Sequence, residues 1–262
     1  MPIHAAGVYD GPSQDCCSNY VVSSYTPTLK ALFRAQQGPR SFAREQINLL
    51  CVAADQAQNP HIATLAHAVT EVQEVADIAQ RAGAFNVSSI TTLFQKDDLA
   101  MLQAANAVHF ACHGIQDTQH PHESRFCLRG GDITVSELMS MDLKHAFLAF
   151  LSACETAKGD IQHADEAVHL AATMLFAGFR SVIATMWYVG SHACRRAYAN
   201  RTERAMRDED GPFLAKRFYA TLFEGASVDV DVVPYALDDA VSALRARGAS
   251  SERWATFIHM GA

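Results

Sequence analysis

Two apolar segments of strand length each end on a chemically reactive side chain. Residues 108–114 read Val-His-Phe-Ala-Cys-His-Gly, and residues 147–154 read Phe-Leu-Ala-Phe-Leu-Ser-Ala-Cys. A predicted helix separates them, and a strand–helix–strand unit places its two strands parallel with a right-handed connection. The carboxyl ends of neighbouring parallel strands open on the same rim, where α/β proteins bind ligands. We therefore expect an α/β fold that carries His113 and Cys154 on one rim of its sheet.

The helix predicted between these strands has a clear beginning. Residues 134–137 read Thr-Val-Ser-Glu, which is the S/T-x-x-E pattern of a capping box. We expect this helix to run to about Leu143. Just before it, Gly130 and Gly131 lie between the short segments 125–128 and 132–135, and this arrangement predicts a hairpin.

The rest of the chain continues the alternation of strands and helices, with no repeat, linker or low-complexity segment. Further strands are predicted at residues 19–25, 47–53, 86–90 and 181–187, and residues 254–259 close the chain. Helices are predicted at residues 28–35, 64–82, 96–105, 166–176, 193–207, 213–223 and 236–247. A single domain over residues 1–262 is the simplest interpretation.

Composition and charge exclude several classes of protein. The chain has 262 residues, 49% of them hydrophobic, so it can bury roughly 75% of its unfolded surface. Its net charge is −7 and it has no basic run, which argues against a nucleic-acid partner. No apolar stretch approaches the ~20 residues of a membrane span, and the first residues lack the basic start of a signal peptide. The seven cysteines are irregularly spaced, as expected for reduced thiols. We expect a cytoplasmic protein with no membrane partner.

His113 and Cys154 form the strongest candidate for catalysis. A histidine beside a thiol supplies a general base next to a nucleophile, which cysteine acyl transfer requires. Two nearby residues receive a structural interpretation instead. His109 lies in the middle of its strand, so we expect it to be buried and hydrogen-bonded, whereas Cys112 faces the opposite side and is expected in the core.

Other chemistries fit the sequence poorly. His113, His120 and His122 lack the spacing of a zinc site, so neither a metal nor another cofactor is predicted. The segment 154–160 begins with cysteine but ends with Asp160 where a cysteine phosphatase needs arginine. A hydrolase elbow needs glycine two residues on either side of its nucleophile. Here those positions hold Ser152 and Thr156.

Four ordered segments resemble the CHAT family of caspase-like domains, which are commonly found beside tetratricopeptide repeats. They are residues 109–114, 150–160, 165–171 and 178–187, and residues 23–29 and 254–259 also fit, with most similarity to fungal members. The resemblance implies a caspase/separase-type three-layer α-β-α sandwich with a mostly parallel central sheet. It implies a single CHAT domain over residues 1–262, lacking the family's upstream strands and repeat region.

The resemblance also implies roles for individual residues. The catalytic histidine falls on His113 and the nucleophile on Cys154, and the backbone N–H groups of Gly114 and Cys154 form the oxyanion hole. Related enzymes often carry acidic residues after the tryptophan that corresponds to Trp187, where they receive a basic P1 side chain. Here residues 188–192 read Tyr-Val-Gly-Ser-His. These five residues include no carboxylate, so the charge that receives a basic P1 side chain would have to come from Asp165 or Glu166. Substrate binding is assigned to these two residues and to Trp187.

These observations predict a regulated cysteine endopeptidase that cleaves protein or peptide substrates through a Cys–His dyad. An upstream repeat region or a regulatory protein is the expected partner. The alternative is a catalytically silent caspase-like module that uses the same rim to bind other proteins.

Overall fold

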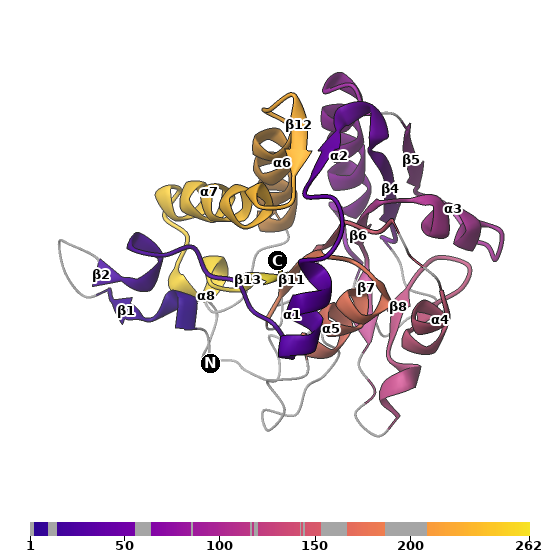
Figure 1. The fold of residues 1–262 in the computed structure, drawn as a ribbon, viewed down its shortest axis with the longest axis horizontal. Helices are drawn as coiled ribbons and strands as arrows, with labels where there is room; N and C mark the ends of the chain where they lie inside the picture. The colour runs from indigo at the N-terminus through magenta and orange to yellow at the C-terminus, as the bar shows by residue number, and fades with distance from the viewer. Residues whose placement is uncertain are drawn as a thin grey trace.

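A six-stranded sheet forms the centre of the molecule (Figure 1). The computed structural model describes residues 3–9, 15–55, 64–84, 86–115, 117, 120–141, 143, 145–152, 167–186 and 209–262. The strands are, in sheet order, β13 (Phe257–Gly261), β11 (Ser181–Thr185), β10 (Leu148–Ser152), β6 (Ala107–Ala111), β4 (Asn48–Ala53) and β5 (Asn86–Ile90). All neighbours are parallel except β13, which runs antiparallel to β11. The predicted mostly parallel sheet is confirmed.

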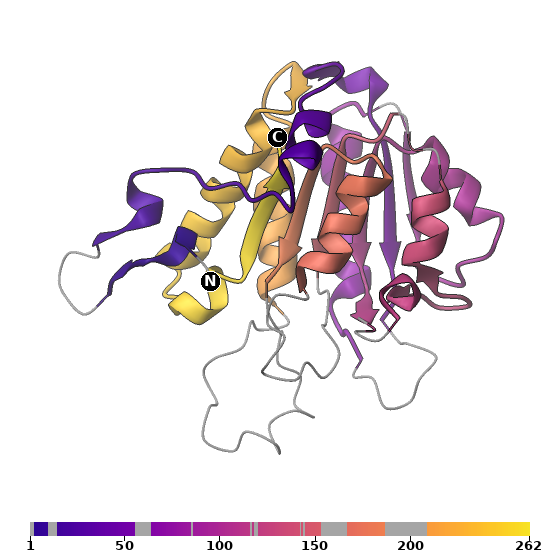
Figure 2. The same cartoon turned by 60° about the horizontal axis from the view of Figure 1, so that its bottom comes forward.

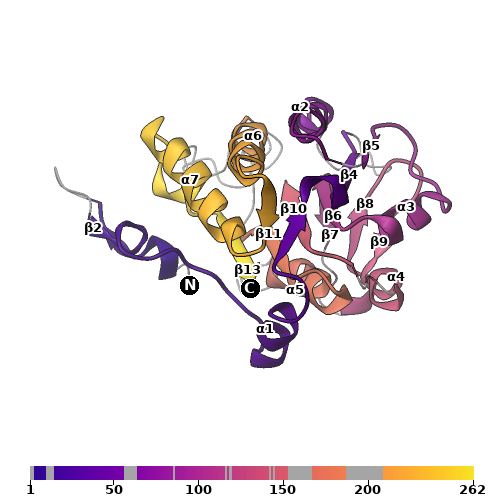
Figure 3. The ribbon, with the colours of Figure 1, turned by 45° about the horizontal axis from the view of Figure 1, so that its top comes forward.

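Helices cover both faces of this sheet, so that the molecule has three layers (Figure 3). One face carries α2 (Ala68–Arg81), α6 (Asp210–Leu222) and α7 (Val232–Ala246). The other face carries α3 (Asp98–Ala104), α4 (Val135–Ser140) and α5 (Ala167–Ala177), and α1 (Leu29–Ala35) packs beside α5 and β13. Every residue of β6 and β10 is buried because both faces are covered, which explains why these strands read as continuous apolar runs.

A second, three-stranded antiparallel sheet follows directly from β6. It contains β7 (His113–Ile115), β8 (Arg125–Cys127) and β9 (Ile133–Thr134). The predicted hairpin joins β8 to β9, and Gly130 takes a φ of +100° in its turn, a value that glycine adopts without strain. Thr134 then caps α4 through the predicted capping box, since its backbone N–H donates to Glu137 at 2.8 Å and its hydroxyl accepts from Glu137 N–H.

Shorter elements complete the described part of the chain. They are the strand pairs β1 (Gly7–Val8) with β2 (Asp15–Cys16) and β3 (Ser41–Ala43) with β12 (Ser227–Asp229), the helix α8 (Ser251–Trp254), and 3₁₀ turns at Ile3–Ala5, Cys17–Asn19, Arg44–Gln46 and Pro121–Glu123. No helix in these described segments is long and apolar enough to cross a membrane.

The strand predicted at residues 19–25 is wrong. The structure has a 3₁₀ turn at Cys17–Asn19 and then an irregular segment that meets β13 only at Tyr25. There, Tyr25 N–H donates to the carbonyl of His259 and the Tyr25 carbonyl accepts from Gly261 N–H, both at 2.9 Å. One such bridge is all the pairing that the segment makes with the sheet edge. The helix predicted at residues 193–207 lies outside the described residues.

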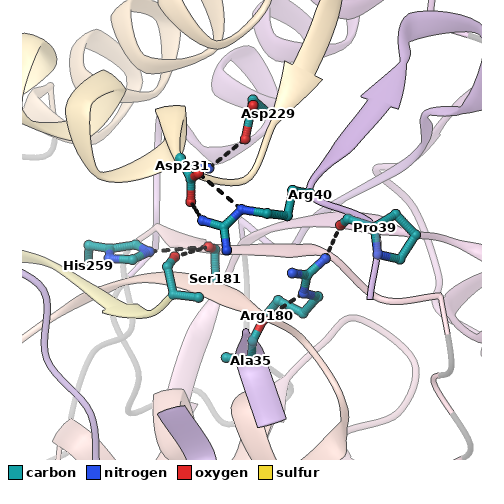
Figure 4. A network of polar contacts seen from close by, with 9 residues as sticks. Ala35, Pro39, Arg40, Arg180, Ser181, Asp229, Asp231 and His259 are labelled. Carbon is teal, nitrogen blue, oxygen red and sulfur yellow. Dashed lines mark hydrogen bonds and ion pairs between the residues drawn. The ribbon is translucent and has the colours of Figure 1, made fainter. Parts of the chain in front are cut away.

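A network of polar contacts lies at the end of the sheet where β11 begins (Figure 4). Arg180 precedes β11 and donates to the carbonyls of Ala35, at 2.7 Å, and Pro39, so that it holds the end of α1. Arg40 pairs with Asp231 beside it. Ser181 follows Arg180 in the sequence, and its hydroxyl lies 3.2 Å from His259 Nε2. Burial lowers the pKa of His259 to about 3. The candidate site lies at the opposite end.

Candidate active site

The carboxyl ends of β6 and β10 define the candidate site. Figure 2 shows these strands side by side in the sheet. The last residue of β6, Ala111, is paired with the last residue of β10, Ser152. In the sequence, His113 therefore comes two residues after Ala111, and Cys154 comes two residues after Ser152. The two strands that lead to them lie about 4.8 Å apart. The predicted parallel arrangement of the two strands is confirmed. Cys154 itself lies outside the described residues, as do Asp165, Glu166 and Trp187.

His113 stands where the chain leaves the main sheet. It is the first residue of β7, where it pairs with Cys127 of β8, and only 1% of its surface is exposed. The next residue, Gly114, is also buried and pairs with Phe126. The β7–β8 pairing thus fixes the backbone of both predicted site residues immediately beyond the rim of β6.

His109 occupies a different environment on the same strand. Its Nε2 atom lies 3.1 Å from a carboxylate oxygen of Glu71 in α2, and its ring stacks on Phe150 at a centroid distance of 4.9 Å. His109 is fully buried and Glu71 is 3% exposed. The expectation that His109 is buried and hydrogen-bonded is confirmed. Cys112, on the other face, is fully buried in the opposite core, as expected.

Glu71 was missed in the sequence although a signal for it exists. It lies three residues after Ala68 and four before Val75, both of which are buried. The helical period therefore places this carboxylate on the apolar face of α2. A charged residue at such a position indicates a buried partner.

The titratable neighbours of this buried pair are themselves neutral groups. Burial raises the pKa of the Cys51 thiol on β4 well above its usual range. Burial likewise raises the pKa of Tyr219 on α6, whose ring centroid lies 5.6 Å from that of His109. Glu71 and His109 thus form a polar pair inside an apolar and uncharged core.

The segment between β7 and β8 holds a small polar group beside His113's strand. Asp117, His120 and Glu123 place one potential ligand atom each within 4.8 Å of one another. Asp117 accepts a hydrogen bond from the backbone N–H of His120 at 2.8 Å, and the backbone N–H of Glu123 donates to the carbonyl of His120 at 2.8 Å. All three side chains are exposed or half-buried, and exposed acidic groups of this kind are common without an ion.

Comparison with known proteins identifies the sequence and the fold. The sequence profile of the CHAT domain matches residues 1–262. No curated protein is similar enough in sequence to be matched. The structure is similar to the crystal structure of the Arg-specific cysteine proteinase gingipain R, with a TM-score of 0.55 and 10% identity over 88% of this chain and 50% of that chain.

Two further structures give the same result. The complex of the pro- and mature domains of RgpB from Porphyromonas gingivalis matches with a TM-score of 0.56 and 11% identity, covering 88% of this chain and 51% of that chain. The separase–securin complex of Saccharomyces cerevisiae matches with a TM-score of 0.50 and 16% identity, covering 88% of this chain and 13% of that chain. The chain spans about half the length of the gingipain chains. The fold is the caspase-like α/β fold that the sequence led us to expect.

Proposed function

Because this chain belongs to the CHAT family, we propose that it is a cysteine endopeptidase in which Cys154 is the nucleophile and His113 the base. The pairing of β6 with β10 supports the proposal, since Ala111 lies opposite Ser152 and both candidates follow two residues later. Adjacent parallel strands bring a base and a thiol to one rim in this way, and acyl transfer needs both groups together.

The proposed reaction uses only groups of this chain and water. His113 takes the proton of Cys154, whose sulfur attacks the peptide carbonyl carbon to form a tetrahedral oxyanion. The backbone N–H groups of Gly114 and Cys154 stabilise that oxyanion, and one such donor contributes about 3 kcal/mol to lowering a barrier. His113 then returns the proton to the leaving amine, and water hydrolyses the thioester. The β7–β8 pairing of Gly114 would hold one of these donors in place.

Regulation and location complete the proposal. We expect an upstream repeat region or a separate regulatory protein to control the activity. We expect the protein to act in the cytoplasm. A silent module that uses the rim only to bind proteins is the competing function.

A peptide-library experiment separates the two functions. The full chain and its Cys154→Ala variant are each incubated with a diverse peptide library, and the products are identified by mass spectrometry. A peptidase yields cleavage products that the variant lacks. If the two proteins give identical product lists while a folded variant still captures the same protein partners, the silent-module alternative is correct.

The P1 preference gives a separate prediction about the same site. A basic P1 side chain in a partly desolvated pocket needs a carboxylate, because an unpaired buried charge costs several kcal/mol. Gly190 and Ser191, which follow Trp187, cannot supply one. We expect peptides with small or apolar P1 residues to be cleaved at least as fast as arginine peptides, as measured by kcat/KM. Efficient cleavage after arginine that is lost in Asp165→Asn or Glu166→Gln would contradict this expectation and identify the acid.

A further inference from the structure

Asp55 carries a buried carboxylate oxygen at the end of β4 that faces the candidate site. It comes two residues after Ala53, the last residue of β4, and the residue as a whole is half-buried. Its Oδ1 atom is shielded from solvent and makes no hydrogen bond within the described part of the chain. The backbone is anchored here, since the carbonyl of Asp55 accepts from Leu65 N–H at 2.8 Å. A buried carboxylate oxygen without a partner is costly, so it indicates a role in the site.

The strand register brings Asp55 beside His113. Ala53 is paired with Ala111 of β6. The two strands stay together one residue further, because Ala54 N–H donates to the carbonyl of Ala111 at 2.9 Å. In the sequence, Asp55 comes two residues after Ala53, and His113 comes two residues after Ala111. The two positions therefore follow the same register pair on neighbouring strands, about 4.8 Å apart.

The alternation of buried residues gives the face of the sheet on which the two side chains lie. Ala53 and Ala111 belong to the core on the α2 side, whereas the residues that follow them, Ala54 and Cys112, belong to the opposite core. One residue later, the alternation returns both strands to the α2 side. The carboxylate and the imidazole therefore share one face of the sheet.

A carboxylate next to a catalytic histidine has a defined use. It accepts a hydrogen bond from Nδ1–H, which leaves Nε2 as the base, and its charge favours the imidazolium that forms when the base takes a proton. Such hydrogen bonds are often long before a substrate binds and shorten during the reaction, which is consistent with an oxygen that has no partner at rest. Asp117, the next carboxylate after His113 in the sequence, already accepts from His120 N–H.

We propose that Asp55 is a positioning residue of the peptidase, which accepts from Nδ1–H of His113 and so directs Nε2 toward the thiol of Cys154. Asp55 keeps its charge and exchanges no proton during the reaction. The inference rests on the proposed function, since it adds a third residue to that mechanism.

The first experiment separates kcat from KM in the Asp55→Asn variant. Asparagine has the same shape without the charge, and the Leu65 N–H contact uses only the backbone of residue 55. We expect kcat to fall by about 10²-fold and KM to change by less than about threefold, because the contact acts in the transition state. Peptides with arginine and with alanine at P1 should lose the same factor. If the variant does not fold by circular dichroism, Asp55→Ala removes the same carboxylate and is measured in the same way.

Asp132→Asn is the matched control. Asp132 lies between β8 and β9, in the small sheet that carries His113, and its carboxylate pairs with Arg125 at 2.9 Å. Both side chains are about one-third exposed, so this variant should keep the parental kcat. Equal kcat values in the Asp55 and Asp132 variants would overturn the proposal. A loss confined to the arginine peptide and to KM would also overturn it, because Asp55 would then bind the P1 side chain.

The second experiment needs no substrate. The rate at which iodoacetamide alkylates Cys154 is measured by peptide mass spectrometry in the parent, in Asp55→Asn, in His113→Ala and in the double variant. We expect Asp55→Asn to slow alkylation by about tenfold, within the range of couplings between neighbouring groups. The double variant should be no slower than His113→Ala, because Asp55 acts only through His113. Additive losses would overturn the proposal. A parent that cleaves no peptide would contradict the proposed function, and this cycle would still show whether Asp55 acts on His113.

Discussion

Cys154→Ala is expected to lower the rate of peptide cleavage by about 10⁴-fold or more, and His113→Ala by a similar factor. The thiol has no substitute as a nucleophile, and without its base a cysteine of ordinary pKa is mostly protonated at neutral pH. The measurement is kcat/KM on the best peptide found in the library, with circular dichroism as the check on folding.

The double variant should be no slower than either single one, because a nucleophile and its base act as one unit. Cys112→Ala is the matched control. Cys112 is the residue next to His113 in the sequence, but its side chain is buried in the core on the other face of the sheet. A folded Cys112→Ala protein that loses activity as completely as Cys154→Ala would show that the dyad is misassigned.

The sequence predicted the central sheet well because its strands are buried on both faces. Continuous apolar runs at β6 and β10 have few other stable placements, and their connection through α4 makes them parallel. The end of α4 was less well predicted. The helix stops at Ser140 rather than Leu143, since Met141 already takes an extended ψ of 142°. No local residue type marks that stop.

Contacts between distant elements were the part that sequence patterns could not predict. The pair formed by His109 and Glu71 joins positions 38 residues apart, on a strand and on a helix. The contact of Cys16 with Arg245 spans 229 residues. Periodicity indicates which face a residue occupies, but it does not identify the partner that packs opposite. For the candidate site, the parallel course of β6 and β10 followed from topology, whereas their register is seen only in the structure. The pairing of His113 with Cys154 as base and nucleophile was predicted from the residues themselves. The oxyanion-hole and substrate-binding roles came from the family resemblance.

The buried pair in α2 and β6 leads to the second large expected effect. Glu71→Ala should lower the free energy of unfolding by about 3–5 kcal/mol, the range seen when one partner of a buried pair is removed. The His109 ring would then be left in the core without its partner, since its Nδ1 atom makes no hydrogen bond among the described residues. Helix propensity works against this loss, because alanine is the better helix former. Urea unfolding followed by circular dichroism measures the change.

Glu74→Ala is the matched control for this measurement. Glu74 lies three residues further along α2 and pairs with Lys216 at 3.3 Å, but their side chains are 38% and 59% exposed. Such a surface pair contributes less than about 1 kcal/mol, so this variant should unfold close to the parent. Glu71→Gln then separates two forms of the buried contact. The glutamine oxygen can still accept from His109, so near-parental stability would indicate a neutral hydrogen bond, and a loss as large as that of Glu71→Ala would indicate an ion pair. Equal stability of Glu71→Ala and Glu74→Ala would contradict the buried contact itself.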